Sequence, residues 1–280
     1  MLWTHSYNNL WLQSLIIIII FCFTLGERVF NYSKTEKIPL LEDLLGEMKN
    51  SGLLMILEMK PSFSLYNFEL SKETGRAVAK MVKEMGLEKQ VILSSFDALK
   101  LYHARKEFNK LNVCFLVTKN YWKRTDLLKY SKANLGNIDS LKECVKNTSG
   151  EDYGSFILES GAVCKAISAS SLDMDFGIYN NPKYSNKTFE MFKKNYGANF
   201  SYGAWTIYKM ELSEKDLAET EEVVQMLIDN GAERFYTDDA PRLLKKLGRS
   251  VRRNSASSFV LSSMSFYFML FVLSVFFQID

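Results

Sequence analysis

Histidine and cysteine, the side chains most often used for soft-metal ligation and for acid–base or nucleophilic chemistry, are scarce in this sequence. The chain of 280 residues has two histidines, His5 and His103, and four cysteines, at positions 22, 114, 144 and 164. No pair of cysteines has CxxC spacing, which argues against a zinc ribbon and a dense disulfide framework. One disulfide is compatible with the count, but the spacing does not assign it.

An excess of charge of one sign is also lacking. The formal net charge is +3, and the basic residues are spread out until a cluster that runs from Lys245 to Arg253. Nucleic acid is therefore not a predicted partner. With 47% hydrophobic and 24% charged residues, the composition indicates one sizeable globular domain with additional segments, and not a low-complexity or disordered chain.

Two uncharged hydrophobic segments bracket the rest of the sequence. The segment 15–25 has the length of a signal-peptide core, although no Lys or Arg precedes it, so residues 1–34 are interpreted as a signal peptide or an anchor. The segment 259–277 is about long enough to cross a bilayer and predicts a C-terminal transmembrane segment. A buried core helix is the alternative for the second segment.

The sequence gives conflicting indications of the side of the membrane on which the domain lies. Basic residues follow the first segment and precede the second, which favours a cytosolic domain. Four glycosylation sequons favour the secretory lumen instead, and they begin at Asn31, Asn147, Asn186 and Asn199. A C-terminal lipid-anchor signal is a third option, but its spacer before Phe259 is too short. We therefore expect a membrane location, in the endomembrane system or the plasma membrane, with no side assigned.

Between these segments, strand-like and helix-like stretches alternate. Strands are expected at 53–61, 91–96, 112–118, 201–208 and 232–238, and helices at 40–49, 69–85, 97–108, 185–195, 213–230 and 241–247. The stretches 156–160 and 162–168 fit either a strand or a helix, within a region from 125 to 185 that is hard to interpret. This alternation predicts a parallel sheet with helical crossovers.

The first of these strands, LLMILEMKP at 53–61, ends in charged residues. Because side chains alternate along a strand, Leu54, Ile56, Glu58 and Lys60 are expected on one side. At the carboxyl end of a parallel strand, where α/β folds place their ligands, a carboxylate suits a hard cation and an ammonium suits a phosphate. An ordinary Glu–Lys pair at the end of a core strand is the alternative interpretation.

The order of five motifs resembles the C-terminal two thirds of the glycerophosphodiester phosphodiesterase domain, a TIM-barrel family. The motifs span residues 38–247 and read IPLLEDLL, LLMILEMKP, VILSSFD, AWTIY and NGAERFYTDDAPRLLKKL. The resemblance implies a (β/α)8 barrel of the α/β class that is incomplete here, because its first strands are missing, with a partial domain at 35–248 between the two hydrophobic segments. It also implies hydrolysis of a phosphoric diester in lipid metabolism.

The resemblance further assigns roles by position. Glu58 would be a ligand of a divalent cation, Ca or Mg, Lys60 would face the phosphodiester, and Trp205 would line the substrate pocket as an apolar wall. Trp205 fits a simple core aromatic equally well. The matching residues Ser95, Phe96, Asp97, Thr237 and Asp238 are interpreted as mainly structural.

Departures from the family pattern limit these assignments. The sequence lacks the family's His-Arg, Glu-Asn-Thr, Glu-x-Asp and His-Asp motifs, which supply the catalytic histidines and most metal ligands, and Tyr208 stands where the family commonly has Asn. His103 lies within a predicted helix, where we expect a partly exposed residue and not a catalytic one. The cation site is therefore expected to be incomplete, and no catalytic residue is assigned.

Two hypotheses follow for the function. The first is a membrane-associated phosphodiesterase of glycerophosphodiesters or lysophospholipids that is inactive as this truncated chain. The second is a non-catalytic, membrane-tethered remnant that binds lipids or a partner. Missing barrel strands would leave unpaired edges, so a partner chain covering the open barrel edge is a further expectation.

Overall fold

The computed structural model describes residues 40–61, 67–121, 123–150, 152–181, 188–197, 200–209 and 212–249. Within these ranges the chain forms two compact units. The first contains residues 40–116 and 120–171, and the second contains 117–119 and 172–249, apart from the gaps between the described ranges. Both hydrophobic segments and His5 lie outside the described residues. Among the helices that are described, none has the length and hydropathy that a bilayer span requires.

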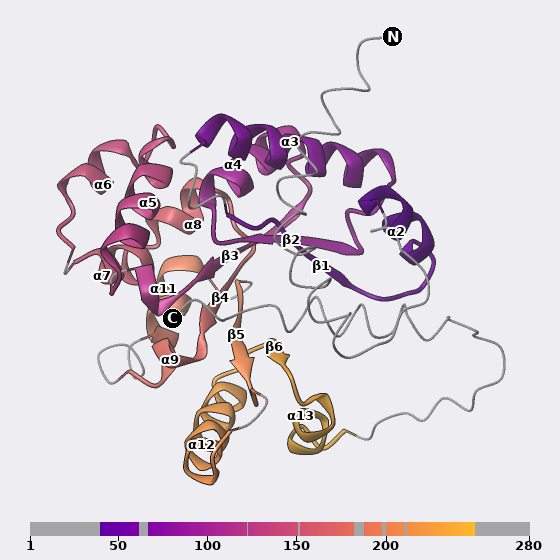
Figure 1. The fold of residues 1–280 in the computed structure, drawn as a ribbon, viewed down its shortest axis with the longest axis vertical. Helices are drawn as coiled ribbons and strands as arrows, with labels where there is room; N and C mark the ends of the chain where they lie inside the picture. The colour runs from indigo at the N-terminus through magenta and orange to yellow at the C-terminus, as the bar shows by residue number, and fades with distance from the viewer. Residues whose placement is uncertain are drawn as a thin grey trace, which may run out of the picture. The chain divides into compact units, whose positions relative to one another are not determined.

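The first unit begins with alternating helices and parallel strands (Figure 1). Its elements are α2 (Leu41–Met48), β1 (Met55–Glu58), α3 (Phe68–Glu84), β2 (Val91–Ser95), α4 (Ala98–Glu107), β3 (Asn112–Val117), the 3-10 turn η1 (Lys119–Tyr121), α5 (Thr125–Gly136), α6 (Lys142–Asn147), α7 (Tyr153–Glu159) and α8 (Ala162–Ala166). The pairs β1–β2 and β2–β3 are both parallel, as the alternation of strands and helices predicted.

Strands and helices also alternate in the second unit. Its elements are β4 (Ser171–Asp175), α9 (Phe176–Tyr179), α11 (Thr188–Tyr196), β5 (Ser201–Ile207), α12 (Glu214–Asp229), β6 (Arg234–Thr237) and α13 (Ala240–Lys246). Here β5 pairs with β6 in parallel, with a bulge between Ala204 and Ile207. Strand order follows chain order within each unit, which is the connectivity of a TIM barrel and not of a doubly wound sheet. The fold is an incomplete α/β barrel, with six strands among the described residues.

Local signals explain where the helices begin and end. The side chain of Ser213 accepts a hydrogen bond from the amide of Asp216, so Ser213 caps α12 as predicted. After α3 the chain turns at Gly86, which has φ of +68° and allows the left-handed conformation that ends the helix. The two stretches that fitted either a strand or a helix are helical, as α7 and α8.

The expected strand at 53–61 is shorter than predicted. It begins at Met55, whose amide donates to the carbonyl of Gln90, whereas Leu53 and Leu54 are 45% and 56% exposed. The chain turns at Gly52, which has φ of +72°, and it pairs with β2 only from Met55 onward. Of the four residues expected on one side of this strand, Leu54 precedes β1 and Lys60 follows it, so only Ile56 and Glu58 lie within β1.

Candidate functional site

Glu58 and Lys60 meet at the carboxyl end of β1, as the alternation of the strand predicted. The Lys60 ammonium lies 2.9 Å from Oε2 of Glu58, and the two side chains are 30% and 9% exposed respectively. The carboxylate is thus nearly buried while the ammonium keeps partial access to solvent. A strand end that carries such a pair in a parallel α/β fold is a candidate ligand site.

The backbone next to this pair is held by β2. The amide of Met59 donates to the carbonyl of Ser94 at 2.8 Å, and the hydroxyl of Ser95 donates to the carbonyl of Met59 at 2.5 Å. Ser95 also accepts a hydrogen bond from the amide of Asp97 at 2.9 Å. These contacts confirm the structural interpretation of Ser95 and Asp97, because both residues stabilise the end of β1 or the start of α4.

Burial dominates the electrostatics of the pair. Removal from water raises the pKa of Glu58 to about 7, although the charge of Lys60 and the hydrogen bond from Lys60 oppose this shift. Burial likewise lowers the pKa of Lys60, and Glu58 opposes that shift. Near neutral pH the site can therefore hold or release a proton on Glu58 with little cost in free energy.

A divalent cation would find one suitable ligand in Glu58. Its Oε1 is buried and has no hydrogen-bond partner, so this oxygen is available to a hard cation. However, no group of three or more His, Cys, Asp or Glu side chains with metal-binding geometry occurs among the described residues. Glu58 thus fits one coordination position only, and no catalytic step can be assigned to a metal from the residues described.

His103 is in the helix α4, as predicted, but it is not partly exposed. Its exposed fraction is 7%, in a helix that packs against α3, α5 and the strand β2. The imidazole makes an edge contact with Tyr102, and its Nδ1 has no hydrogen-bond partner. Burial lowers the pKa of His103 to about 4, with neighbouring cationic side chains adding to the effect, so it is neutral at physiological pH.

Trp205, the third predicted site residue, belongs to the second unit and lies on β5. It is 5% exposed, and its indole Nε1 donates to the backbone carbonyl of Asp173 on β4 at 3.3 Å. The peptide bond between Trp205 and Thr206 is cis. The ring is therefore anchored within its unit, as a core aromatic would be, while its role as a pocket wall stays a prediction.

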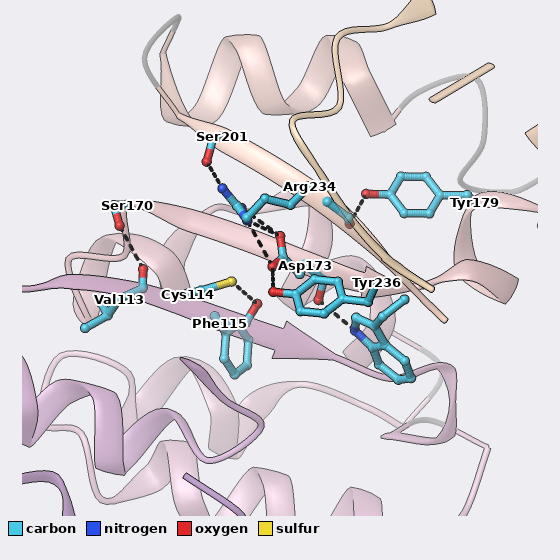
Figure 2. A network of polar contacts seen from close by, with 11 residues as sticks. Val113, Cys114, Phe115, Ser170, Asp173, Tyr179, Ser201, Arg234 and Tyr236 are labelled. Atoms are coloured by element: carbon cyan, nitrogen blue, oxygen red, sulfur yellow. Dashed lines mark hydrogen bonds and ion pairs between the residues drawn. The ribbon is translucent and has the colours of Figure 1, made fainter. Parts of the chain in front are cut away.

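The second unit contains a buried polar network that the sequence did not predict (Figure 2). Asp173 is fully buried, and Figure 2 shows the guanidinium of Arg234 and the hydroxyl of Tyr236 converging on its carboxylate. Arg234 donates to both carboxylate oxygens, with Nη2 2.7 Å from Oδ1 and Nε 3.1 Å from Oδ2. Tyr236 donates to Oδ2 at 2.5 Å, and Arg234 also donates to Ser201. A fully buried carboxylate is thus balanced by a paired charge and a phenol.

Gly203 makes room for this network. A Cβ atom at this position would lie 2.6 Å from the carbonyl oxygen of Arg234 and 2.7 Å from Oδ1 of Asp173. Asp173 therefore approaches β5 where that strand has no side chain. The strict alternation of polar and apolar residues in SLDMD, at 171–175, is the signal that could have identified β4 and Asp173 from sequence.

Comparison with known proteins decides the family. The model of the glycerophosphoryl diester phosphodiesterase family matches residues 12–151. The chain belongs to this family. The match includes Glu58 and Lys60 but not Trp205, and it begins three residues before the hydrophobic segment 15–25. A search of curated proteins found no match.

Solved structures similar to this chain include three from bacteria. A glycerophosphoryl diester phosphodiesterase from Silicibacter pomeroyi DSS-3 is 16% identical over 76% of this chain and 58% of its own, with a TM-score of 0.49. A glycerophosphodiester phosphodiesterase from Parabacteroides distasonis is 18% identical over 77% and 66%, with a TM-score of 0.48. An Oleispira antarctica phosphodiesterase, solved with the product sn-glycerol-3-phosphate, is 13% identical over 75% and 62%, with a TM-score of 0.45. This chain thus spans 58 to 66% of the length of these structures.

Proposed function

We propose that the protein is a phosphoric diester hydrolase of the glycerophosphodiester phosphodiesterase type, acting on glycerophosphodiesters or lysophospholipids. The observation that carries this proposal is the Glu58–Lys60 ion pair at the end of β1, within the part of the chain that matches the family. In this proposal Glu58 contributes one ligand to a divalent cation, Ca or Mg, which stabilises the negative charge that develops on the phosphoryl oxygens. Lys60 faces the phosphodiester, and Trp205 lines the pocket.

The geometry of the pair supports this division of roles. The unpartnered Oε1 of Glu58 is free to accept a cation, while Oε2 stays with Lys60. The Lys60 side chain is 30% exposed, so its ammonium can approach an anion without losing all of its hydration. Ammonium groups bind phosphate as compact point charges and tolerate several orientations of the phosphoryl oxygens.

The part of the proposal that concerns the membrane has a separate basis. We propose that the protein acts in lipid metabolism and that residues 259–277 attach it to a membrane, because that segment is uncharged and about long enough to span one. A membrane location would bring the domain close to lysophospholipids, whose phosphodiesters lie at the bilayer surface.

One observation favours binding without catalysis as a second candidate. Within the described residues Glu58 has no companion ligands in metal-binding geometry, and the one described histidine, His103, is buried in a helix with a pKa of about 4. A pair that lacks an acid and a base could still hold a phosphate-bearing lipid through Lys60.

The test is hydrolysis of glycerophosphocholine by the full chain, with added Ca or Mg and after chelation. Cation-dependent release of a phosphomonoester, with a clear loss of it in Glu58→Gln and a loss of about 100-fold in Lys60→Met, the scale of removing one charge-stabilising donor, would support the proposal and would show that the inactivity expected from the sequence is wrong. Glu69→Gln is the matched control, because Glu69 forms an exposed ion pair with Lys72 at 2.5 Å in the same unit.

The outcomes separate the two candidates. Cation-dependent turnover that survives Glu58→Gln undiminished would refute the ligand role of Glu58. No turnover with either cation, together with binding of lysophosphatidylcholine vesicles that Lys60→Met abolishes, would establish the binding function in place of catalysis. Loss of activity in Glu69→Gln equal to that in Glu58→Gln would show that the effect is not specific to the pair.

A further inference from the structure

Lys100 is a fully buried lysine near the carboxyl end of β1, although its place in a charged helix is typical of an exposed residue. It lies in the first turn of α4 with an exposed fraction of 0%. Its ammonium donates to the backbone carbonyl of Lys60 at 2.6 Å. Burial of an ammonium costs free energy unless the group is hydrogen-bonded, and burial here lowers the pKa of Lys100 while the nearby carboxylate of Asp97 opposes that shift. The chain therefore keeps a titratable amine at this point despite the cost of burying it.

The base of the Lys100 side chain is held in place from two directions. Asp97 caps α4 and accepts a hydrogen bond from the amide of Lys100 at 3.1 Å. The Asp97 carboxylate also accepts hydrogen bonds from three buried side chains, at 2.6 to 2.9 Å, which are Ser71, Tyr130 and Asn134. From the other side, α3 approaches so closely at Gly75 that an added Cβ would collide with the carbonyl oxygen of Lys100. The backbone from which the Lys100 side chain extends is therefore held in place from both sides.

The acceptor belongs to the residue whose side chain forms the ion pair. β2 holds Met59, through the contacts of Ser94 and Ser95 with its amide and carbonyl. Lys100 holds the next residue, Lys60, after β1 has ended and the ladder hydrogen bonds have stopped. The direction in which the Lys60 side chain leaves the backbone therefore depends on a contact that the sheet does not supply.

We propose that Lys100 is a positioning residue for the Glu58–Lys60 pair, and that its buried ammonium fixes the Lys60 backbone so that the Lys60 side chain is oriented toward the bound phosphodiester. The catalytic consequence rests on the proposed function of the pair. The geometric consequence, which is an ordered end of β1, does not depend on that function. The catalytic and the geometric consequence are therefore measured separately.

The experiment uses the full chain with Lys100→Met, which keeps the length of the side chain and removes the ammonium. The matched control is Lys132→Met, because Lys132, on α5, donates at the same 2.6 Å to a backbone carbonyl in the same unit, but to that of Thr148 and not to a residue at the end of β1. Hydrogen exchange of the peptide 55–61, which contains the Met59 amide, reports the order of the strand end. Turnover of glycerophosphocholine is separated into kcat and KM.

We expect exchange in peptide 55–61 to accelerate about tenfold in Lys100→Met, with other peptides of the unit unchanged, and kcat to fall at least tenfold while KM changes less than threefold. Lys132→Met should change neither quantity. If Lys100→Met does not fold, Lys100→Gln is measured in its place with the same expectation, because its neutral side chain is one bond shorter and its amide ends short of the Lys60 carbonyl.

Unchanged exchange at 55–61 in a folded variant would overturn the proposal. Faster exchange in every peptide of the unit would also overturn it, because that pattern marks general destabilisation. If the unmodified chain has no turnover, the proposed function fails, but local acceleration of exchange still establishes that Lys100 orders the strand end. If turnover is present and Lys100→Met leaves kcat unchanged, the positioning role fails while the proposed function stands.

Discussion

The unusual proton affinity of Glu58 makes the stability of the folded protein depend on pH in a direction opposite to most carboxylates. Its pKa is raised from the ordinary value of 4.5 to about 7. Between these two pH values the folded protein keeps a proton on Glu58 that the unfolded chain has already released. The free energy of unfolding must therefore fall as pH rises through this window, and its contribution from Glu58 is fully present only below pH 4.5. A difference between 4.5 and about 7, at about 1.4 kcal/mol per pH unit, amounts to about 3 kcal/mol.

Urea unfolding of the unmodified chain and of Glu58→Gln, at intervals from pH 4.5 to 7.5 and with a chelator present, measures this contribution. The comparison is needed because His103 acts in the opposite sense. Its folded-state pKa of about 4 lies below the ordinary 6.5, so its contribution to stability is lost as pH falls from 6.5 toward 4. In the difference between the two proteins, the contribution of His103 cancels.

We expect the stability of the unmodified chain, relative to Glu58→Gln, to decrease by about 3 kcal/mol from the acidic to the neutral end of the window. A constant offset between the two curves, with no slope, would refute the reasoning, because it would mean that Glu58 titrates as it does in an unfolded chain. A slope of the opposite sign would mean that the ion pair with Lys60 outweighs burial.

Two further predictions concern individual side chains. Gly203→Ala should destabilise the protein by about 2 kcal/mol in urea unfolding, because the new methyl group would overlap the carbonyl oxygen of Arg234, whereas Gly46→Ala, with open space around its Cβ in α2, should raise stability by about 0.5 to 1 kcal/mol. Equal effects of the two substitutions would contradict the close approach at Gly203. The imidazole of His103 should titrate in NMR spectra near pH 4, and a midpoint near 6.5 would show that the ring is exposed to water.

Elements whose signals are local in the chain could be predicted from the sequence. The helix α12 needed only its Ser213 cap and its pattern of apolar residues, and α3 needed only Gly86 at its end. Strand alternation likewise predicted Glu58 and Lys60 on one side, and their side chains form an ion pair. In each case the deciding contacts lie within a few positions of one another.

Features that depend on distant partners could not be predicted in this way. Asp173 in β4 resembles a surface residue until Arg234, 61 positions later, is placed beside it. The burial of Lys100 is equally hard to predict. A lysine in a charged helix is ordinarily solvated, and the carbonyl that accepts its hydrogen bond lies 40 positions earlier in the chain. The alternation in SLDMD can place Asp173 on a strand, but no neighbour in sequence supplies the partner of either residue, so its role becomes visible only when distant segments are brought together.

The pairing of Asp173 with Arg234 also has a consequence for biosynthesis. A ribosome that adds about 5 to 20 residues per second would produce the arginine roughly 3 to 12 s after the aspartate. During that interval the carboxylate on β4 has no guanidinium beside it, and burying it would be costly. The second unit is therefore expected to stay open during translation and to close only when β6 emerges, which makes this interval the period in which a chaperone would be most useful to the nascent chain.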